Sequence, residues 1–311
     1  MERDTLSILS NRKTKSMVEK TAAMIFRGCA VVSIVAVLSI TVYMFISGTP
    51  AIFKEGLLEI LFGSVWAPTA DTPSFGILYI ILTSIVGVFI AICIGVPIGV
   101  LTAVNMAEIA NPRVRKIMKS AIELLAGIPS VVYGLLGILL INPFMYKIEL
   151  MIFANDPTHQ FTGGSNLISA ILVLAIMILP TLINITETSL RSVPDDYRKS
   201  SLALGASQMQ TIFKVVIPAA KTGIMSAVVL GVGRAIGEAM AILLVAGNSV
   251  NIPLPFNSVR FLTTGIVSEM GYAAGTHRDV LFTIGLVLFV FIICINLLLT
   301  FVLKRGDNDG K

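Results

Sequence analysis

The sequence is poor in charge: only 13% of its 311 residues are Asp, Glu, Lys or Arg, whereas soluble domains carry about 25%. It also holds few cysteines and histidines. Cys29, Cys93 and Cys294 lie far apart in apolar stretches, so neither a disulfide framework nor a cysteine metal site is expected. His159 and His277 have no second ligand close by in the sequence, which argues against a metal centre.

A nucleotide-binding loop is absent from the sequence as well. Such a loop needs the pattern GxxxxGK[ST], whose backbone amides cradle the phosphates. The only Gly-Lys pair is Gly310-Lys311, at the end of the chain. Neither a nucleophile–base pair nor a carboxylate pair points to catalysis. We therefore expect no enzyme activity and no cofactor in this chain, with ATP and magnesium bound by a separate ATPase subunit.

Apolar residues are abundant: 55% of the chain is hydrophobic and its mean hydropathy is +0.90. Six apolar stretches approach or exceed the roughly 20 residues that a helix needs to cross a bilayer. They cover about residues 26–47, 75–104, 117–140, 167–190, 219–246 and 280–303. The first is longer than the roughly 7–15 apolar residues of a signal peptide. The sequence predicts an all-α, polytopic fold, with six transmembrane helices in a domain at 26–311 after a cytoplasmic segment at 1–25.

The distribution of Lys and Arg predicts the orientation, because cytoplasmic loops are enriched in both. With the N-terminus inside, 18 of the 23 basic residues are cytoplasmic: Arg3, Arg12, Lys13, Lys15, Lys20, Arg27, Arg113, Arg115, Lys116, Lys119, Arg191, Arg198, Lys199, Lys214, Lys221, Lys304, Arg305 and Lys311. Only Lys54, Lys147, Arg260 and Arg278 lie outside. Both termini are expected in the cytoplasm. The net charge of +5 then reflects topology and attraction to lipid headgroups, not nucleic acid binding.

Four ionisable residues fall inside the expected spans, where a central charge costs at least about 2.5–3.5 kcal/mol: Glu123, Glu187, Arg234 and Glu238. Arg234 and Glu238 are four residues apart, on one face of a continuous helix. They form either a structural ion pair or a substrate site, in which Arg234 offers its planar guanidinium to an anion and Glu238 holds it in place. We favour the anion site, because intramembrane charge is usually functional.

We expect structural roles for the glycines beside this pair and for the other two carboxylates. Gly233 and Gly237 form a GxxxG pair, which lets a second helix approach closely. Glu123, about two turns into the third span, is expected to contact a neighbouring helix. Glu187 is close enough to the cytoplasmic end of its span to reach the interface.

A cytoplasmic loop at 191–218 joins the fourth and fifth spans. Ser192 to Asp195 fits an N-capping box, and the helix that follows is expected to stop at Gly205. A second capping box at Ser207 to Gln210 starts a helix with one apolar face. That face consists of Met209, Ile212, Phe213, Val216 and Ile217. Such a unit could lie on lipid as an interfacial helix, but we favour a docking element.

This loop resembles the cytoplasmic signature loop of ABC-transporter permeases, in which a Gly is followed after nine residues by an aliphatic run ending in Pro. Here nine residues separate Gly205 from the run 215–218, Val-Val-Ile-Pro. The family's Glu-Ala-Ala before the Gly is replaced by Lys-Ser-Ser at 199–201. The resemblance implies contact with an ATPase through Leu204, Gly205, Ala206, Ile212 and Phe213.

Three further stretches resemble the permeases of phosphate importers. Residues 123–134 (ELLAGIPSVVYG) resemble the corresponding stretch of these permeases. Residues 233–248 (GRAIGEAMAILLVAGN) and the Trp-Ala-Pro at 66–68 resemble the PstC-type subunit in particular. Ala239 departs from the Thr that is usual in this family.

The resemblance implies a type I ABC importer permease (MetI-like) of the inner membrane that moves phosphate by alternating access. It pairs with a PstA-type permease, a dimer of PstB-type ATPases and a PstS-type binding protein, and Arg234 and Glu238 match its intramembrane pair. A permease for molybdate or sulfate remains an alternative, as does a channel or membrane scaffold outside the ABC class.

Overall fold

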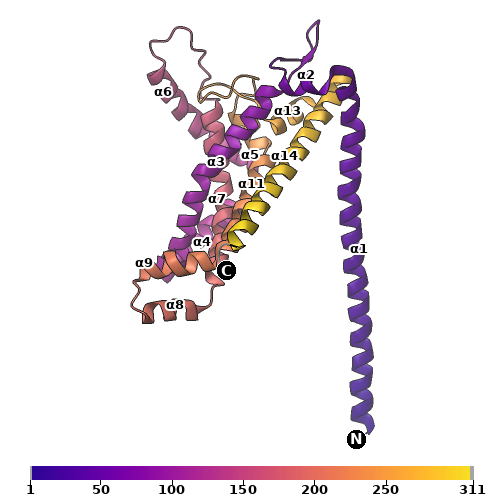
Figure 1. The fold of residues 1–311 in the computed structure, drawn as a ribbon, viewed down its shortest axis with the longest axis vertical. Coiled ribbons are helices and arrows are strands. Elements are labelled where there is room, and N and C mark those ends of the chain that lie inside the picture. Colours follow the sequence, from indigo (N-terminus) through magenta and orange to yellow (C-terminus); the bar gives the residue numbers. More distant parts are fainter. Residues whose placement is uncertain (1, 309–311) are drawn as a thin grey trace.

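The computed structural model describes the backbone of residues 2–308 and the side chains of residues 19–298 and 301 (Figure 1). Many of the basic side chains expected at the two ends of the chain lie outside these ranges, Lys311 among them. The α-helices are α1 Glu2–Glu55, α2 Leu57–Phe62, α3 Leu78–Val104, α4 Pro112–Gly127, α5 Ser130–Leu136, α6 Asn142–Ile152, α7 Leu167–Arg191, α8 Asp195–Ala203, α9 Gln208–Thr211, α10 Ile217–Ala219, α11 Lys221–Gly237, α12 Met240–Val245, α13 Leu262–Glu269 and α14 Gly275–Asn308.

Short irregular elements complete the fold. Three π-helical turns, at Asn105–Ile109, Gly137–Ile141 and Ile212–Val216, extend α3, α5 and α9. Two-residue strands β1 (Trp66–Ala67) and β2 (Ser74–Phe75) pair antiparallel in a small hairpin. The all-α fold class is therefore confirmed.

Helix α7 lies at the centre of the bundle, with α3 and α11 packed against it. Its N-cap is Asn166, whose side chain accepts a hydrogen bond from the backbone N–H of Ser169 at 3.1 Å. Helix α3 approaches closely because a Cβ on Gly95 or Gly99 would lie within 3 Å of Ile178 or Leu182. Small residues allow this approach, since association within lipid depends on close packing.

Helix α1 stands apart from the bundle for most of its length and meets α14 only near the end closest to α2 (Figure 1). There the hydroxyl of Thr283 donates to the carbonyl of Gly48 at 2.7 Å. Helices α2 and α13 mark one end of the bundle, called here the α2 end. Helices α8 and α9 mark the opposite end, the α8 end, and both described ends of the chain point that way (Figure 1).

Five helices of the described chain are long and apolar enough to cross a membrane: Glu19–Glu55, Leu78–Ile109, Ser130–Ile152, Leu167–Arg191 and Gly275–Leu298. A sixth is obtained when Gln208–Ala219 and Lys221–Gly237, bent by 68°, count as one span. The largest differences from the expected spans concern the third and the fifth. The third span begins at Ser130 rather than near 117, because the chain breaks at Ile128–Pro129, and the expected fifth span is broken after Gly237.

Candidate functional site

The candidate site lies where α11 ends. Glu238 has an extended backbone (φ −73°, ψ 129°), so the helix stops at Gly237 and α12 starts at Met240. Arg234 is in the last turn of α11, and its side chain is exposed in this chain. The position predicted for an intramembrane cation is thus at a helix break rather than in the middle of a continuous helix.

The expectation that Glu238 holds Arg234 on one helix face is wrong. Glu238 is buried, and its Oε1 accepts the backbone N–H of Ala241 at 2.9 Å, which caps α12. Its carbonyl accepts the hydroxyl of Thr263 at 2.6 Å. A carboxylate at a helix N-terminus satisfies an amide that has no partner within the helix. Four-residue spacing brings side chains together only within an unbroken helix, and this one is broken.

Arg234 makes few side-chain contacts in the described part of the chain. Its Nη1 lies 3.4 Å from the hydroxyl of Thr181 on α7, and it has no ion pair there. Gly233 and Gly237 flank it on the open side, and a Cβ on either would meet no atom within 4 Å. The expected GxxxG contact is therefore not made within this chain. A permanently charged, exposed guanidinium thus lies beside two glycines that leave the neighbouring helix surface open.

A second helix break lies in contact with the first. Helix α4 ends at Gly127, the backbone is extended at Ile128 and Pro129, and α5 starts at Ser130. The hydroxyl of Tyr133 donates to the carbonyl of Leu125 at 2.7 Å, which ties α5 back to α4.

Helix α5 packs on α12 through Gly134, where a Cβ would lie 2.9 Å from the Cα of Ala241. The two breaks are thus held together by close backbone packing. Glu123, expected to contact a neighbouring helix, is instead exposed on α4.

The loop at 191–218 forms two short helices at the α8 end. The first expected capping box is not formed: α8 has Pro194 as its N-cap, without a side-chain bond, and Ser192 donates to the carbonyl of Ser189. The second box is confirmed, because Ser207 and Gln210 cap each other. Gly205 ends the α8 turn with φ +86°, a conformation that glycine adopts at little cost.

Apolar side chains of this loop divide between core and solvent. Ile212 and Val216 are buried in a cluster with Leu190 and Ile224. Leu204 is 89% exposed, and four more large side chains of the loop are also exposed: Tyr197, Leu202, Met209 and Phe213. A set of exposed apolar side chains on a short rigid unit is typical of a surface that binds another protein.

Sequence reasoning missed the ion pair that fixes this unit. Arg198 on α8 binds Glu108, in the π turn after α3, through Nε (3.1 Å) and Nη2 (2.6 Å). It also donates to the carbonyls of Leu190 and Val193. The hydrogen bonds to Glu108 raise the pKa of Arg198, so the guanidinium stays charged. This pair joins α8 to the end of α3 across 90 residues of sequence, and no local pattern links the two positions.

A second buried ionic cluster, also missed, lies at the α2 end. The carboxylate of Glu269 on α13 binds Arg260 at 2.5 Å, His277 at 2.7 Å and the indole N–H of Trp66 at 3.2 Å. It connects the hairpin, α13 and α14. No group of three His, Cys, Asp or Glu that could hold a metal ion occurs within the described residues.

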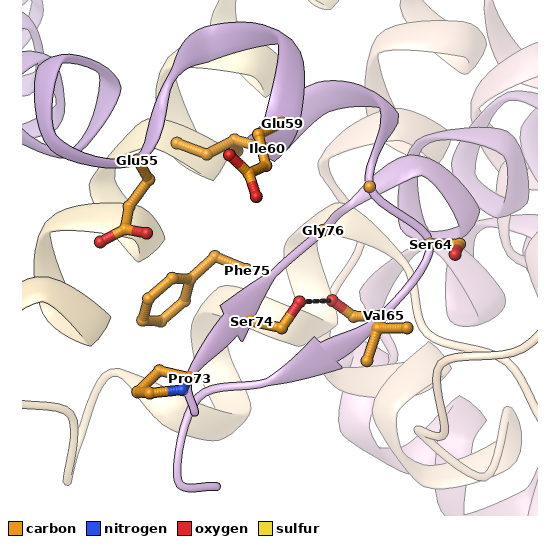
Figure 2. Close-up of a pocket in the computed structure, with 10 residues that line it drawn as sticks. Glu55, Glu59, Ile60, Ser64, Val65, Pro73, Ser74, Phe75 and Gly76 are labelled. Carbon is orange, nitrogen blue, oxygen red and sulfur yellow. Dashed lines mark hydrogen bonds between the residues drawn. The ribbon is translucent and has the colours of Figure 1, made fainter. Parts of the chain in front are cut away.

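A cavity of about 160 Å³ at the α2 end is unsuited to an anion. Figure 2 shows it between α2 and the hairpin, where Ser74 donates to the carbonyl of Val65. Glu55 and Glu59 line it, whereas no Lys or Arg does. Its negative charge would repel phosphate or sulfate. Arg234 remains the better candidate.

Several apolar helices long enough to span a bilayer, two of them broken, indicate a multi-pass membrane protein with an exposed cation at one break. A family model described as "Binding-protein-dependent transport system inner membrane component" matches residues 95–307. The chain belongs to this family. It is therefore a membrane-embedded transport subunit of an ABC importer rather than an enzyme.

Several relatives of this family match the chain over most of their own length. The chain is 36% identical to "Probable ABC transporter permease protein YqgH" of Bacillus subtilis over 303 residues, which is 96% of this chain and 95% of the relative. It is 32% identical over 292 residues (90% and 88%) to "Phosphate transport system permease protein PstC" of Mesorhizobium japonicum. The PstC protein of Pasteurella multocida is 34% identical over 235 residues, 72% and 73% of the two chains. The resemblance to PstC-type permeases is confirmed.

A solved structure, "Inward facing conformations of the MetNI methionine ABC transporter", matches 72% of this chain and 91% of its own with a TM-score of 0.50. At 21% identity this likeness concerns the fold alone.

Proposed function

We propose that this chain is a permease subunit of an ATP-driven phosphate importer, in which Arg234 binds the anion during passage. The observation that carries the proposal is the exposed guanidinium at the break between α11 and α12, with no ion pair among the described residues. An anion that leaves water needs charge-assisted hydrogen bonds in return, and a planar guanidinium supplies two in parallel. Phosphate is favoured over molybdate or sulfate because several relatives are named phosphate transport permeases.

Three partners follow from this proposal. A PstA-type permease would cover the open face at Gly233 and Gly237 and supply the other wall of the path. A dimer of PstB-type ATPases, which would bind ATP and magnesium, would dock on the exposed apolar side chains around Leu204 and Gly205. A PstS-type binding protein would deliver phosphate at the α2 end. A channel or scaffold would need none of the three.

The proposed orientation places the α8 end in the cytoplasm, with both termini. Of the 23 basic residues, 18 then lie inside and four outside. This puts the docking loop on the side where ATP is available. In the proposed alternating-access cycle, closure of the ATPase dimer would move α8, and the pair between Arg198 and Glu108 would transmit that movement to α3.

The test is uptake of labelled phosphate, sulfate and molybdate by proteoliposomes that contain the complete importer and its binding protein. We expect ATP-dependent uptake of phosphate alone. Uptake of sulfate or molybdate in preference to phosphate would assign a different oxyanion, and uptake without ATP would identify a channel.

A further inference from the structure

A stripe of polar side chains leads along α7 from Arg234 toward the α8 end. Thr181, Asn184, Thr188 and Arg191 follow one another at intervals of three, four and three residues, which places them on one helix face. Thr181 already contacts Arg234. At 1.5 Å per residue, the stripe covers about 15 Å of α7.

Helix α11 adds hydroxyls to the same side. Helices α7 and α11 run antiparallel, because Gly231 packs on Leu182 while Gly223 packs on Ser189, farther toward the α8 end. Ser226 and Thr222, which are exposed, therefore lie beside the half of the α7 stripe that is nearer the α8 end. Two neighbouring membrane helices thus present polar side chains side by side.

Hydrogen bonds within the helices account for only some of the polar side chains in this stripe. Hydroxyls within a helix can bond to a preceding carbonyl, as Thr188 does to Asn184 at 2.8 Å and Ser226 to Thr222 at 2.9 Å. The side-chain amide of Asn184 makes no such bond. It is half-buried, and it has no hydrogen-bond partner within residues 19–298. An amide carries two donors and an acceptor, and leaving them in lipid is costly, so this position requires water, a solute or a partner chain.

The stripe ends in a charged cluster that carries an excess of positive charge. Glu187 is buried and forms ion pairs with Arg191 on its own helix and with Lys119 on α4, at 3.9 Å. The two cations are 41% and 47% exposed. One carboxylate cannot neutralise both cations, so these three groups together carry a net charge of +1.

We propose that this stripe is the inward half of the anion path: Asn184 and Thr188, with Ser226 and Thr222, carry the anion from Arg234 to a second binding station at Arg191 and Lys119. The proposal deepens the function proposed above and rests on Arg234 as the first station. Polar groups spaced along the path replace the water of the anion stepwise. Glu187 weakens the second station enough for release, since conduction requires binding that is weak enough to leave.

The test is modification of single cysteines in the complete importer, in a background without the three native cysteines. Asn184→Cys and Thr188→Cys are treated with an anionic and a cationic methanethiosulfonate in inverted vesicles, with and without ATP and the binding protein. We expect both positions to react with the anionic reagent about tenfold faster than with the cationic one, because fixed cations concentrate anions along a path. Thr186→Cys, on the buried side of the same helix, should not react.

Slow modification at 184 and 188, or modification without preference for the anionic reagent, overturns the path. The change Arg191→Gln should reduce the anionic preference at 188 several-fold, and Arg191→Lys should retain it. Unchanged preference in Arg191→Gln overturns the second station.

Added phosphate should slow the reaction at both positions. If sulfate protects and phosphate does not, the path stands and the proposed phosphate substrate fails. As a functional check, Asn184→Leu should lower uptake about tenfold while Thr186→Val, a matched loss of a buried hydroxyl without a partner, leaves it unchanged. Equal uptake by the two variants contradicts the proposal.

Discussion

The Glu238 carboxylate accepts a hydrogen bond from the backbone N–H of Ala241, 2.9 Å away, in the first turn of α12. Its negative charge stabilises a helix terminus instead of neutralising Arg234. The cation therefore remains available to a solute, although a carboxylate follows it by four residues. This arrangement separates the structural role of Glu238 from the binding role proposed for Arg234.

The first prediction concerns this cap. Glu238→Ala should lower stability by about 0.5–2 kcal/mol, the range found when a side chain that bonds to a free amide at a helix N-terminus is removed. Glu238→Gln keeps an acceptor oxygen and should cost less than half as much. Thermal unfolding of the purified permease complex in nanodiscs measures both.

Because the side chains of Arg234 and Glu238 are not paired, adding Glu238→Gln to Arg234→Gln should not restore uptake. Restoration near the parental rate would instead establish a structural ion pair.

The second prediction concerns ATPase docking. Leu204 is 89% exposed, so Leu204→Ser should leave the fold intact. We expect it to reduce co-purification of the ATPase at least about tenfold, as removal of a central apolar anchor does at protein interfaces. Gly205, the next residue, has a positive φ. Gly205→Pro should do the same, since proline cannot adopt this φ.

Leu58→Ser is the matched control for Leu204→Ser, because Leu58 is 71% exposed at the opposite end of the molecule. It should leave the amount of bound ATPase unchanged. Normal ATPase binding by Leu204→Ser would remove the loop from the interface.

The third prediction concerns transmission through Arg198. Glu108→Gln removes a charge-assisted pair worth about 1.5–3 kcal/mol. It should loosen α8, raise proteolysis of the loop several-fold and lower the phosphate transported per ATP hydrolysed. Asp195→Asn is the matched control, because Asp195 also contacts Arg198, at 3.4 Å, but is 79% exposed, and surface pairs contribute only about 0.2–1 kcal/mol. Equal effects of the two changes would argue against a special role for Glu108.

The fourth prediction tests orientation. Single cysteines at Ser64 and Ser200, both exposed, are placed in a background without the three native cysteines. An impermeant thiol reagent added to intact cells should label position 64 and not position 200. In inverted vesicles the pattern should be reversed. Labelling of position 200 in sealed cells would contradict the proposed topology.

Hydropathy predicted most of the membrane helices, because a span about 20 residues long dominates any local average. It did not predict where helices break. Pro129 and Gly237 were visible in the sequence, but proline and glycine also occur in intact membrane helices, so neither identifies a break alone. The breaks depend on packing across the bundle, such as the close approach of Gly134 to Ala241.

Local capping chemistry was predicted with mixed success. The Ser207–Gln210 box forms because both partners lie within one turn. The Ser192–Asp195 box fails because Pro194 is already the N-cap of α8. The pair between Arg198 and Glu108 spans 90 residues, and no local pattern could have indicated it.

The most direct test of Arg234 as the anion site is ATP-driven phosphate uptake by proteoliposomes with the complete importer carrying Arg234→Gln. The loss of two charge-assisted hydrogen bonds, about 1.5 kcal/mol each at the least, predicts a fall of about a hundredfold. Arg234→Lys should recover only part of the uptake, since an ammonium is not a planar fork. Arg278→Gln, the same change at the α2 end of α14, should leave uptake unchanged. Normal assembly with uptake reduced to background is the predicted result, and uptake by Arg234→Gln at the parental rate would contradict the account.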